Sequence, residues 1–284
     1  MAVSLLFLYG VAVLLAGLVG GWLPRRVHMT HTRTQLTMSF VAGLMLGVAF
    51  FHLIPHSALA PSADVDFTML WVVVGLVFML LLLRLFHFHQ HDFAAADGTC
   101  EHRAADQHPH EHAHEHAHAQ APRGPFTWLG LLFGLSIHTV IDGIALGAVM
   151  RATPESGAGL LGIGVFLAIL LHKPLDALSI ETVMAAAGQP VRHRHYINVA
   201  FAALCPLTAW LFWLAVDPGL GIGLLLPAAL AFSAGAFICI ALGDLLPEVQ
   251  FHSHDRLKLT LLFAVGIAIA WGIGMFEPGH VHFA

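Results

Sequence analysis

The sequence predicts an all-α membrane protein that crosses a bilayer eight times. Composition is the first observation behind this fold class. Hydrophobic residues make up 58% of the 284 residues, charged residues make up only 10%, and the mean hydropathy is +0.79. Soluble domains contain about 25% charged residues, so most of this chain is not suited to water. The other two observations are repeated apolar runs of spanning length and an uneven distribution of basic residues between them.

The apolar runs define the expected helices, because a spanning helix needs roughly 20 mostly apolar residues. The first run has no Lys or Arg before it, whereas a signal peptide requires a positive amino-terminal region, so we expect a retained helix. For the sixth run a re-entrant or surface helix stays an alternative. In chain order the runs are 2–23, 36–59, 67–86, 126–150, 158–183, 196–216, 220–247 and 257–276.

The basic residues predict the orientation of these spans, because cytoplasmic loops are enriched in Lys and Arg. Ten of the twelve basic residues lie in or beside the odd-numbered loops. The exceptions are Arg151, in an even-numbered loop, and Lys173, inside a span. We therefore expect cytoplasmic odd-numbered loops and both termini outside, which agrees with an even number of spans.

A histidine-rich loop at 87–125 separates spans one to three (1–86) from spans four to eight (126–284). It holds ten of the 22 histidines, including the run HPHEHAHEHAHA at 108–119. Such a segment cannot build a packed core, but it can hold metal ions loosely. On the cytoplasmic side it could buffer or sense arriving metal and be dispensable for transport; the alternative is a solvated linker without a role.

Two pairs of ionisable residues lie in the middle of spans four and five. An ionisable group at the centre of a bilayer costs about 2.5–3.5 kcal/mol on insertion scales, so it requires a reason. His138 and Asp142 are four residues apart, and so are His172 and Asp176, which places each pair on one helix face. Two imidazoles and two carboxylates facing each other suit zinc, although imidazole also accepts iron, cobalt, nickel or copper. Calcium and magnesium would need more oxygen ligands.

Two further pairs flank this centre. His52 and His56 lie toward the outer end of the second run, and Asp244 and Glu248 lie toward the cytoplasmic end of the seventh. They are candidates for an entrance and an exit for metal. For Asp244 and Glu248 a solvated helix end is an equal alternative.

Four stretches resemble the ZIP family of zinc and iron permeases: FHLIPHSA, HTVIDGIALG, HKPLDA and FSAGAFICIALGDLLPEV. The resemblance covers essentially the whole chain and implies a ZIP-like bundle that moves metal into the cytoplasm. It also implies alternating access by movement of one helix bundle against another, and a homodimer. Carried over by position, the metal ligands are His138, Asp142, His172 and Asp176, with the second helix contributing near His52.

The chain departs from the family pattern at Thr139 and Lys173, where residues of a second, adjoining metal subsite are usual. This argues against a two-metal centre, and we hypothesise that Lys173 replaces the second metal as a modulator of site charge. Loss of its proton on metal binding could couple transport to protons; a purely structural ion pair with Asp176 is the equal alternative. Unchanged pH dependence of uptake after Lys173→Asn would exclude coupling.

Other functions stay open at this point. A catalytic zinc keeps three protein ligands and an open position, so an intramembrane hydrolase is one alternative, although no nucleophile or oxyanion group stands out and we do not expect an enzyme. A metal exporter or sensor is another. Zinc is the expected substrate, with Cd²⁺, Fe²⁺, Mn²⁺ and Co²⁺ as further candidates. The small net charge of −5 and the scattered basic residues argue against nucleic acid as a partner. The apolar composition indicates a lipid bilayer, and we expect a bacterial inner membrane.

Overall fold

The computed structural model describes residues 2–23, 31–86, 127–152, 162–216, 223–245 and 256–275. These residues are almost entirely helical, and eight of their helices are long and apolar enough to cross a membrane. Two of the eight spans contain a π-helical turn that follows an α-helix directly. The elements are α1 (Ala2–Trp22), α2 (His31–Val48), η2 (Ala49–Leu53), α3 (Ile54–Ala58), α4 (Val65–Phe86), α5 (Thr127–Ala152), α6 (Ile163–Ala186), α7 (Val191–Ala215), α8 (Leu225–Ile240), η5 (Ala241–Leu245) and α10 (Arg256–Gly274).

The eight predicted spans are all present, including the sixth, which forms the full-length helix α7. The predicted starts of several helices are wrong by five residues. Helix α2 begins at His31 and not at 36, and α7 begins at Val191 and not at 196. Both helices continue through polar residues that the apolar pattern excludes. Helix α6 begins at Ile163 and not at 158, because Gly162 has a left-handed backbone with φ of 64°.

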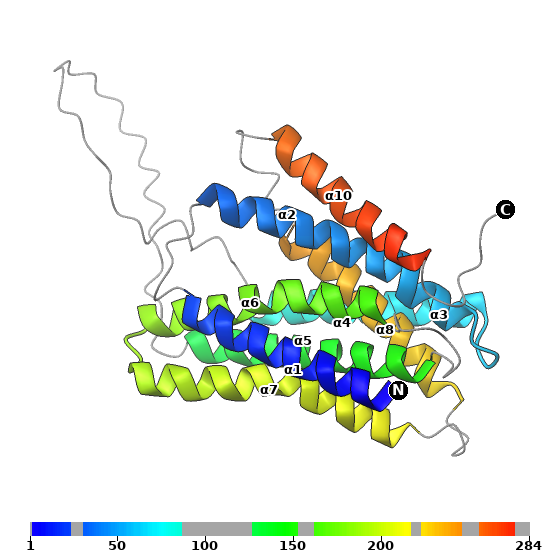
Figure 1. The fold of residues 1–284 in the computed structure, drawn as a ribbon, viewed down its shortest axis with the longest axis horizontal. Coiled ribbons are helices and arrows are strands. Elements are labelled where there is room, and N and C mark those ends of the chain that lie inside the picture. The colour runs from blue at the N-terminus through cyan, green and yellow to red at the C-terminus, as the bar shows by residue number, and fades with distance from the viewer. Residues whose placement is uncertain are drawn as a thin grey trace.

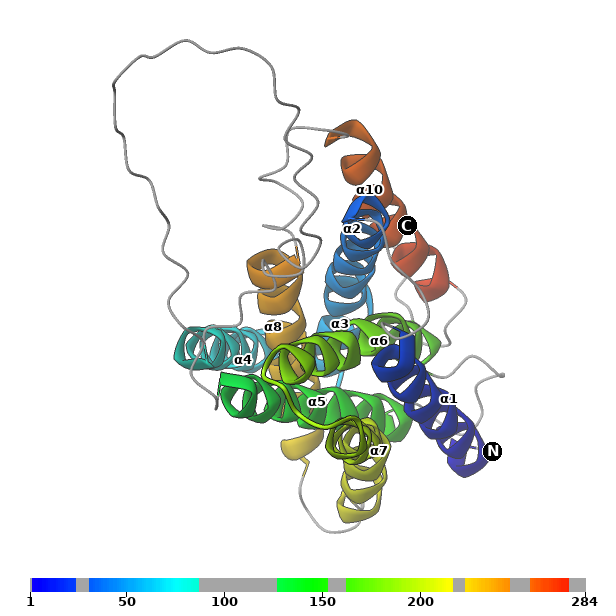
Figure 2. The same cartoon turned by 90° about the vertical axis from the view of Figure 1, so that its left-hand side faces the viewer.

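The helices pack as two groups (Figures 1 and 2). In the first group α1 packs on α6 and α7, and α5 packs on α7. In the second group α2 packs on α10, and α4 packs on α8. The groups meet where α5 faces α8 and where α6 faces α2. We call this boundary the seam.

Glycines bring the helices of a group into backbone contact. A Cβ on Gly43 of α2 would collide with the carbonyl of Phe263 on α10, and a Cβ on Gly266 of α10 would collide with the carbonyl of Phe40. Small residues at such crossings allow close approach of helices in a membrane. The reciprocal pattern makes α2 and α10 a tightly joined pair.

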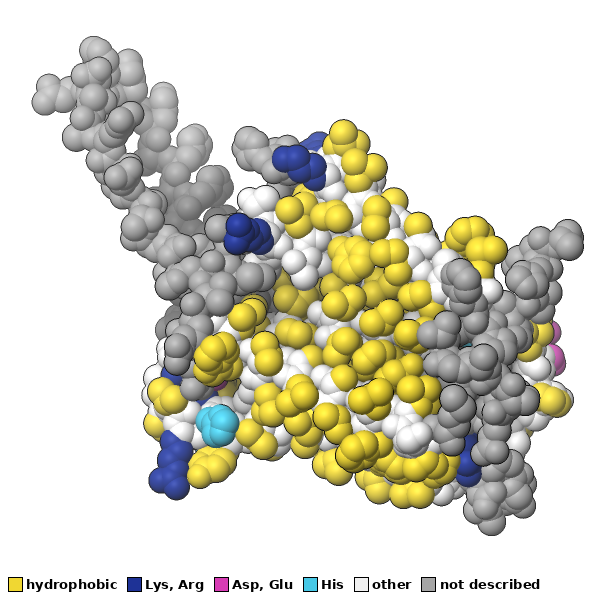
Figure 3. Space-filling model, in the orientation of Figure 1, with side chains coloured by type: hydrophobic (Ala, Val, Ile, Leu, Met, Phe, Trp, Pro, Cys, Tyr) yellow, Lys and Arg dark blue, Asp and Glu magenta, His cyan; other side chains and the backbone are white. Residues whose placement is uncertain are grey.

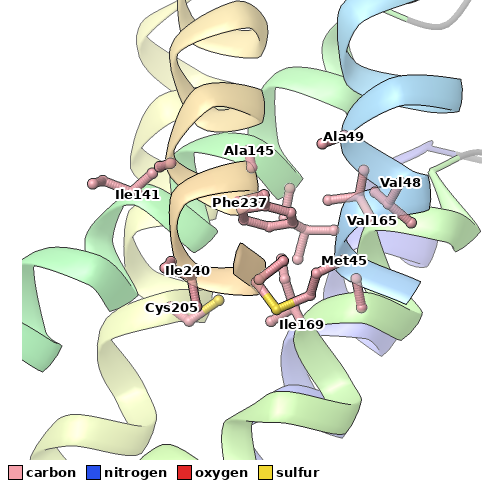
Figure 4. Close-up of a cluster of buried hydrophobic side chains, with 14 of the residues drawn as sticks. Met45, Val48, Ala49, Ile141, Ala145, Val165, Ile169, Cys205, Phe237 and Ile240 are labelled. Carbon is pink, nitrogen blue, oxygen red and sulfur yellow. The ribbon is translucent and has the colours of Figure 1, made fainter. Parts of the chain in front are cut away.

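Apolar side chains fill the seam (Figure 4). Phe237 of α8 lies beside Ala145 of α5, and Val165 and Ile169 of α6 face Val48 of α2. All five are buried.

The outer surface fits a bilayer. Large apolar side chains are exposed along α1, α4, α7 and α10, and apolar side chains are spread over much of the face seen in Figure 3. Basic side chains gather mainly toward the left-hand end of that view. The opposite end holds the start of α1 and the end of α10 (Figure 1), as the basic-residue pattern predicts for outward termini.

Candidate metal centre

Helices α5 and α6 bring the two predicted residue pairs together. Their antiparallel arrangement places His138 and Asp142 of α5 against His172 and Asp176 of α6. One ligand atom from each residue lies within 4.8 Å of the other three, and all four residues are buried. The structure therefore brings together the four residues that their spacing in the sequence singled out.

The distances between these ligand atoms are those of a compact four-ligand site. Oδ2 of Asp142 lies 3.6 Å from Nε2 of His138 and 3.2 Å from Nε2 of His172. Oδ2 of Asp176 lies 3.7 Å and 3.9 Å from the same two nitrogens. Tetrahedral zinc with bonds of about 2.0–2.1 Å places its ligand atoms about 3.3 Å apart. Only small inward shifts of the side chains would bring all four atoms to a single zinc ion.

The imidazole of His172 is oriented by its own helix. Its Nδ1 lies 2.8 Å from the carbonyl oxygen of Ala168. A carbonyl oxygen only accepts, so Nδ1 donates, and in the neutral ring Nε2 then carries a lone pair. This lone pair faces Oδ2 of Asp142, an arrangement that a shared cation stabilises. Hydrogen bonding of the second ring nitrogen is the usual way in which proteins orient a histidine ligand.

His138 provides a second observation in favour of a cation. Both of its ring nitrogens are buried and make no hydrogen bond. Buried polar atoms in proteins are nearly always satisfied, and exceptions call for an explanation. A metal ion bound at Nε2 would satisfy one of the two nitrogens.

Lys173 approaches the same carboxylates. Its Nζ donates to Oδ2 of Asp142 at 2.7 Å, to Oδ2 of Asp176 at 3.2 Å and to Oγ1 of Thr139 at 2.8 Å. These three acceptors match the three N–H bonds of an ammonium group. The side chain is fully buried, and Nζ lies 5.3 Å from the centre of the Phe201 ring. Two carboxylates and one ammonium give the site a formal charge of −1.

Close packing by α1 supports this side of the site. A Cβ on Gly20 would lie 2.5 Å from Cα of Pro174, and a Cβ on Gly17 would lie 3.9 Å from Cγ of Lys173. Pro174 lies inside α6 and has no N–H, so it interrupts the hydrogen bonding of the helix between the two ligand residues. Gly20 allows the backbone of α1 to lie directly against this interruption.

Two of the flanking residues, His52 and His56, make hydrogen bonds of their own to backbone carbonyl groups. In the described part of the chain the cluster does not include His52, whose Nε2 donates to the carbonyl oxygen of Ala270 at 2.8 Å. Nδ1 of His56 donates to the carbonyl oxygen of His52 at 2.6 Å. The backbone of Asp244 belongs to η5. Its side chain, Glu248 and the histidine-rich loop lie outside the described residues.

Two aromatic residues border the site without having been singled out from the sequence. The Phe237 ring meets the His172 ring edge-on, with centroids 6.3 Å apart, and Phe201 lies under the Lys173 ammonium. The chain contains 20 phenylalanines, most of them in apolar runs. Nothing in the local sequence distinguishes these two.

Buried imidazoles and carboxylates on adjoining spans of an eight-helix bundle define a membrane protein that binds transition-metal ions. Comparison with known proteins agrees with this class. The family model of the ZIP zinc transporter matches residues 2–274. The chain therefore belongs to the ZIP zinc transporter family. It is a multi-pass membrane protein that transports metal ions, and it is not an enzyme.

Individual relatives are distant in sequence. Zinc transporter ZIP9-B of Xenopus laevis is 27% identical over 88% of this chain and 87% of its own length. Zinc transporter ZIP3 of Homo sapiens is 26% identical over 52% of this chain and 46% of its own length. Zinc transporter foi of Drosophila melanogaster is 32% identical over 51% of this chain and 19% of its own length.

Proposed function

We propose that this chain carries zinc into the cytoplasm through a single-ion site formed by His138, Asp142, His172 and Asp176. The observation that supports this most directly is the buried cluster itself, with ligand atoms of all four residues within 4.8 Å of one another. Two imidazole nitrogens and two carboxylate oxygens form a donor set typical of zinc. The relatives named above are zinc transporters. Cd²⁺, Fe²⁺, Mn²⁺ and Co²⁺ are further candidate substrates.

The proposed mechanism is alternating access across the seam. The ligands belong to α5 and α6 of the first helix group, and the second group contributes apolar residues such as Phe237 on the facing side. Movement of one group against the other would expose the site to one side of the membrane at a time. We propose that metal enters past His52 and His56 and leaves past Asp244 and Glu248.

We further propose that Lys173 takes the place of a second metal ion. One divalent cation changes the formal charge of the site from −1 to +1, and the ammonium already uses Oδ2 of both carboxylates. A second divalent cation would have to be placed beside the ammonium without additional negative ligands, so the electrostatic interaction disfavours it.

The resemblance to the family supports two further parts of the proposal, namely a homodimer and uptake in the inward direction. A bacterial inner membrane as the location stays a prediction. The relatives named above come from animals.

The test is uptake of radioactive zinc into proteoliposomes by the wild type and by a His138→Ala, Asp176→Ala double variant. A matched control is Asp66→Asn, which removes an exposed carboxylate at the start of α4. We expect uptake by the wild type and the control but not by the double variant. Equal uptake by all three proteins would exclude the proposed site. Zinc binding by a wild type that moves no metal would instead favour the sensor.

A further inference from the structure

His52 is buried in the bundle at the seam. Its proposed place on the metal entrance does not explain this burial. It lies in η2, where the second span has a π-helical turn between α2 and α3. Such single turns insert an extra residue into a helix and are frequent at functional sites. The imidazole is fully buried at the seam, and three helices meet around it.

One contact fixes the imidazole within its own helix group. Its Nε2 donates to the carbonyl oxygen of Ala270 on α10 at 2.8 Å. Because a carbonyl oxygen accepts only, this bond orients the ring. A second bond acts on the backbone of the same turn, since Nδ1 of His56 donates to the carbonyl oxygen of His52 at 2.6 Å.

The other contact crosses the seam. The ring lies directly over Gly164 of α6, where a Cβ would lie 2.7 Å from Cε1 and 3.0 Å from both ring nitrogens. A real Cβ essentially never approaches another side chain within 3.0 Å, so only glycine leaves room for this ring. The fit is therefore specific to one relative position of α6 and η2.

The contact lies on the outer side of the metal centre. Gly164 precedes His172 by eight residues, or about 12 Å along the helix axis. Between the two levels lie the buried apolar residues Val165 and Ile169 of α6, with Val48 and Ala49 across the seam (Figure 4). If only apolar side chains met at the seam, α6 and the second span could slide past each other. A ring seated over one glycine instead favours a single relative position of the two helices.

We propose that the His52 imidazole, bonded to Ala270 and seated over Gly164, keeps the outer part of the seam closed in this conformation. This inference rests on the proposed transport by alternating access, and it assigns His52 a positioning role in addition to its proposed place on the metal entrance. Opening of the outer seam during transport then requires the imidazole ring to move away from Gly164.

The experiment measures access to the seam directly. Val165→Cys supplies a thiol in a background in which Cys100, Cys205 and Cys239 are replaced by Ala. A charged, water-soluble maleimide then labels the full-length protein in lipid nanodiscs, where both faces are accessible. Four proteins are compared, and all of them carry Val165→Cys and lack the three native cysteines. The first has no other change and is called the background. The other three add Gly164→Ala, His52→Ala, or both substitutions. Gly272→Ala is the matched control, because its added Cβ meets nothing within 4 Å.

We expect Gly164→Ala to label about tenfold faster than the background, because its methyl group displaces the ring and shifts population toward the open seam. His52→Ala and the double variant should also label faster than the background, because both lack the ring that closes the seam. The control should match the background. An unchanged labelling rate in Gly164→Ala would refute the proposal, and so would an unchanged labelling rate in His52→Ala.

Zinc titration of each variant separates this inference from the proposed transport. The metal centre should still bind zinc in Gly164→Ala, because Gly164 is neither a proposed ligand nor part of the proposed entrance. Labelling requires no transport, so a protein that fails to move zinc still tests the closure. If Gly164→Ala loses zinc binding and does not fold, His52→Ala alone decides: faster labelling supports the closing role, and an unchanged rate overturns it.

Discussion

Nζ of Lys173 and Nε2 of His172 lie 2.7 Å and 3.2 Å from the same atom, Oδ2 of Asp142. A carboxylate oxygen offers two lone pairs, so this oxygen can accept from the ammonium and still ligate a metal ion. The same division holds at Oδ2 of Asp176, which lies 3.2 Å from the ammonium. Lys173 therefore competes for negative charge with the ion that the site binds.

Replacing Lys173 by Met should make the zinc-free protein less stable and the zinc-bound protein relatively more stable. Removing one partner of a buried ion pair costs about 3–5 kcal/mol, because the remaining charge is uncompensated. Zinc would then supply the missing positive charge. The measurement is thermal unfolding with and without zinc, in which the zinc-induced rise in melting temperature should exceed that of the wild type.

Lys258→Met is the control for this experiment, since Lys258 is exposed on α10. This substitution should have little effect on the melting temperature, either with zinc or without it. An identical zinc-induced rise in Lys173→Met and the wild type would contradict the competition between the ammonium and the metal.

Glu181 and Arg194 should stabilise the predicted cytoplasmic end of the first helix group as a pair. Nη1 of Arg194 donates to Oε1 of Glu181 at 3.0 Å, and both side chains are largely buried. Glu181→Leu alone should destabilise the protein by about 3 kcal/mol, whereas Glu181→Leu with Arg194→Met should cost less. Denaturant or thermal unfolding measures both, with Arg192→Met as an exposed control on the same helix. If the changes in the free energy of unfolding caused by the two substitutions were additive, a stabilising interaction between Glu181 and Arg194 would be excluded.

Alanine at Gly143 should weaken both the fold and zinc binding. A Cβ there would lie 2.6 Å from the carbonyl oxygen of Cys205 and would also collide with the hydroxyl of Thr208. Relief requires α5 to move away from α7, and Asp142 is the adjacent residue. Overpacking of this kind costs about 1–3 kcal/mol.

The control for this substitution is Gly272→Ala, where alanine enters open space in a helix and should leave stability unchanged or raised by up to about 1 kcal/mol. Melting temperature and zinc titration provide the comparison. A tolerated Gly143→Ala with normal zinc affinity would contradict the close crossing of α5 and α7.

Deleting residues 87–125 should lower the number of weakly bound zinc ions per chain and leave uptake at the transport site. The segment contains ten of the 22 histidines, none of them among the proposed ligands. A short Gly–Ser linker would join α4 to α5. Equilibrium dialysis measures binding and proteoliposome uptake measures transport, and loss of uptake in a well-folded deletion protein would show that the loop is required.

The eight spans and the four-residue cluster could be predicted because each depends on local pattern. Apolar length defines a span, and a spacing of four residues places His138 and Asp142 on one face of a helix. Helix ends were less predictable where polar residues continue a helix beyond the bilayer. The starts of α2 and α7 are the clearest cases.

Contacts between distant segments could not be predicted. The partner of His52 is the carbonyl of Ala270, 218 residues away, and any helical residue offers a carbonyl. The spacing of Lys173 and Asp176 predicted their ion pair, but the contact to Asp142 depends on how α5 faces α6. The π-helical turn at η2 also lacks a local signal, because its residues suit an ordinary α-helix equally well.

The formal charge at Lys173, Asp142 and Asp176 has a consequence for energy supply. In the proposed cycle the site has a charge of +1 when it holds one divalent ion and −1 when it is empty. A membrane potential that is negative inside draws the loaded site inward and drives the empty site outward. Each elementary charge gains about 2.3 kcal/mol per 100 mV of potential crossed. The voltage would thus assist both halves of an inward cycle, whereas without the ammonium it would act only on the return of a doubly negative, empty site.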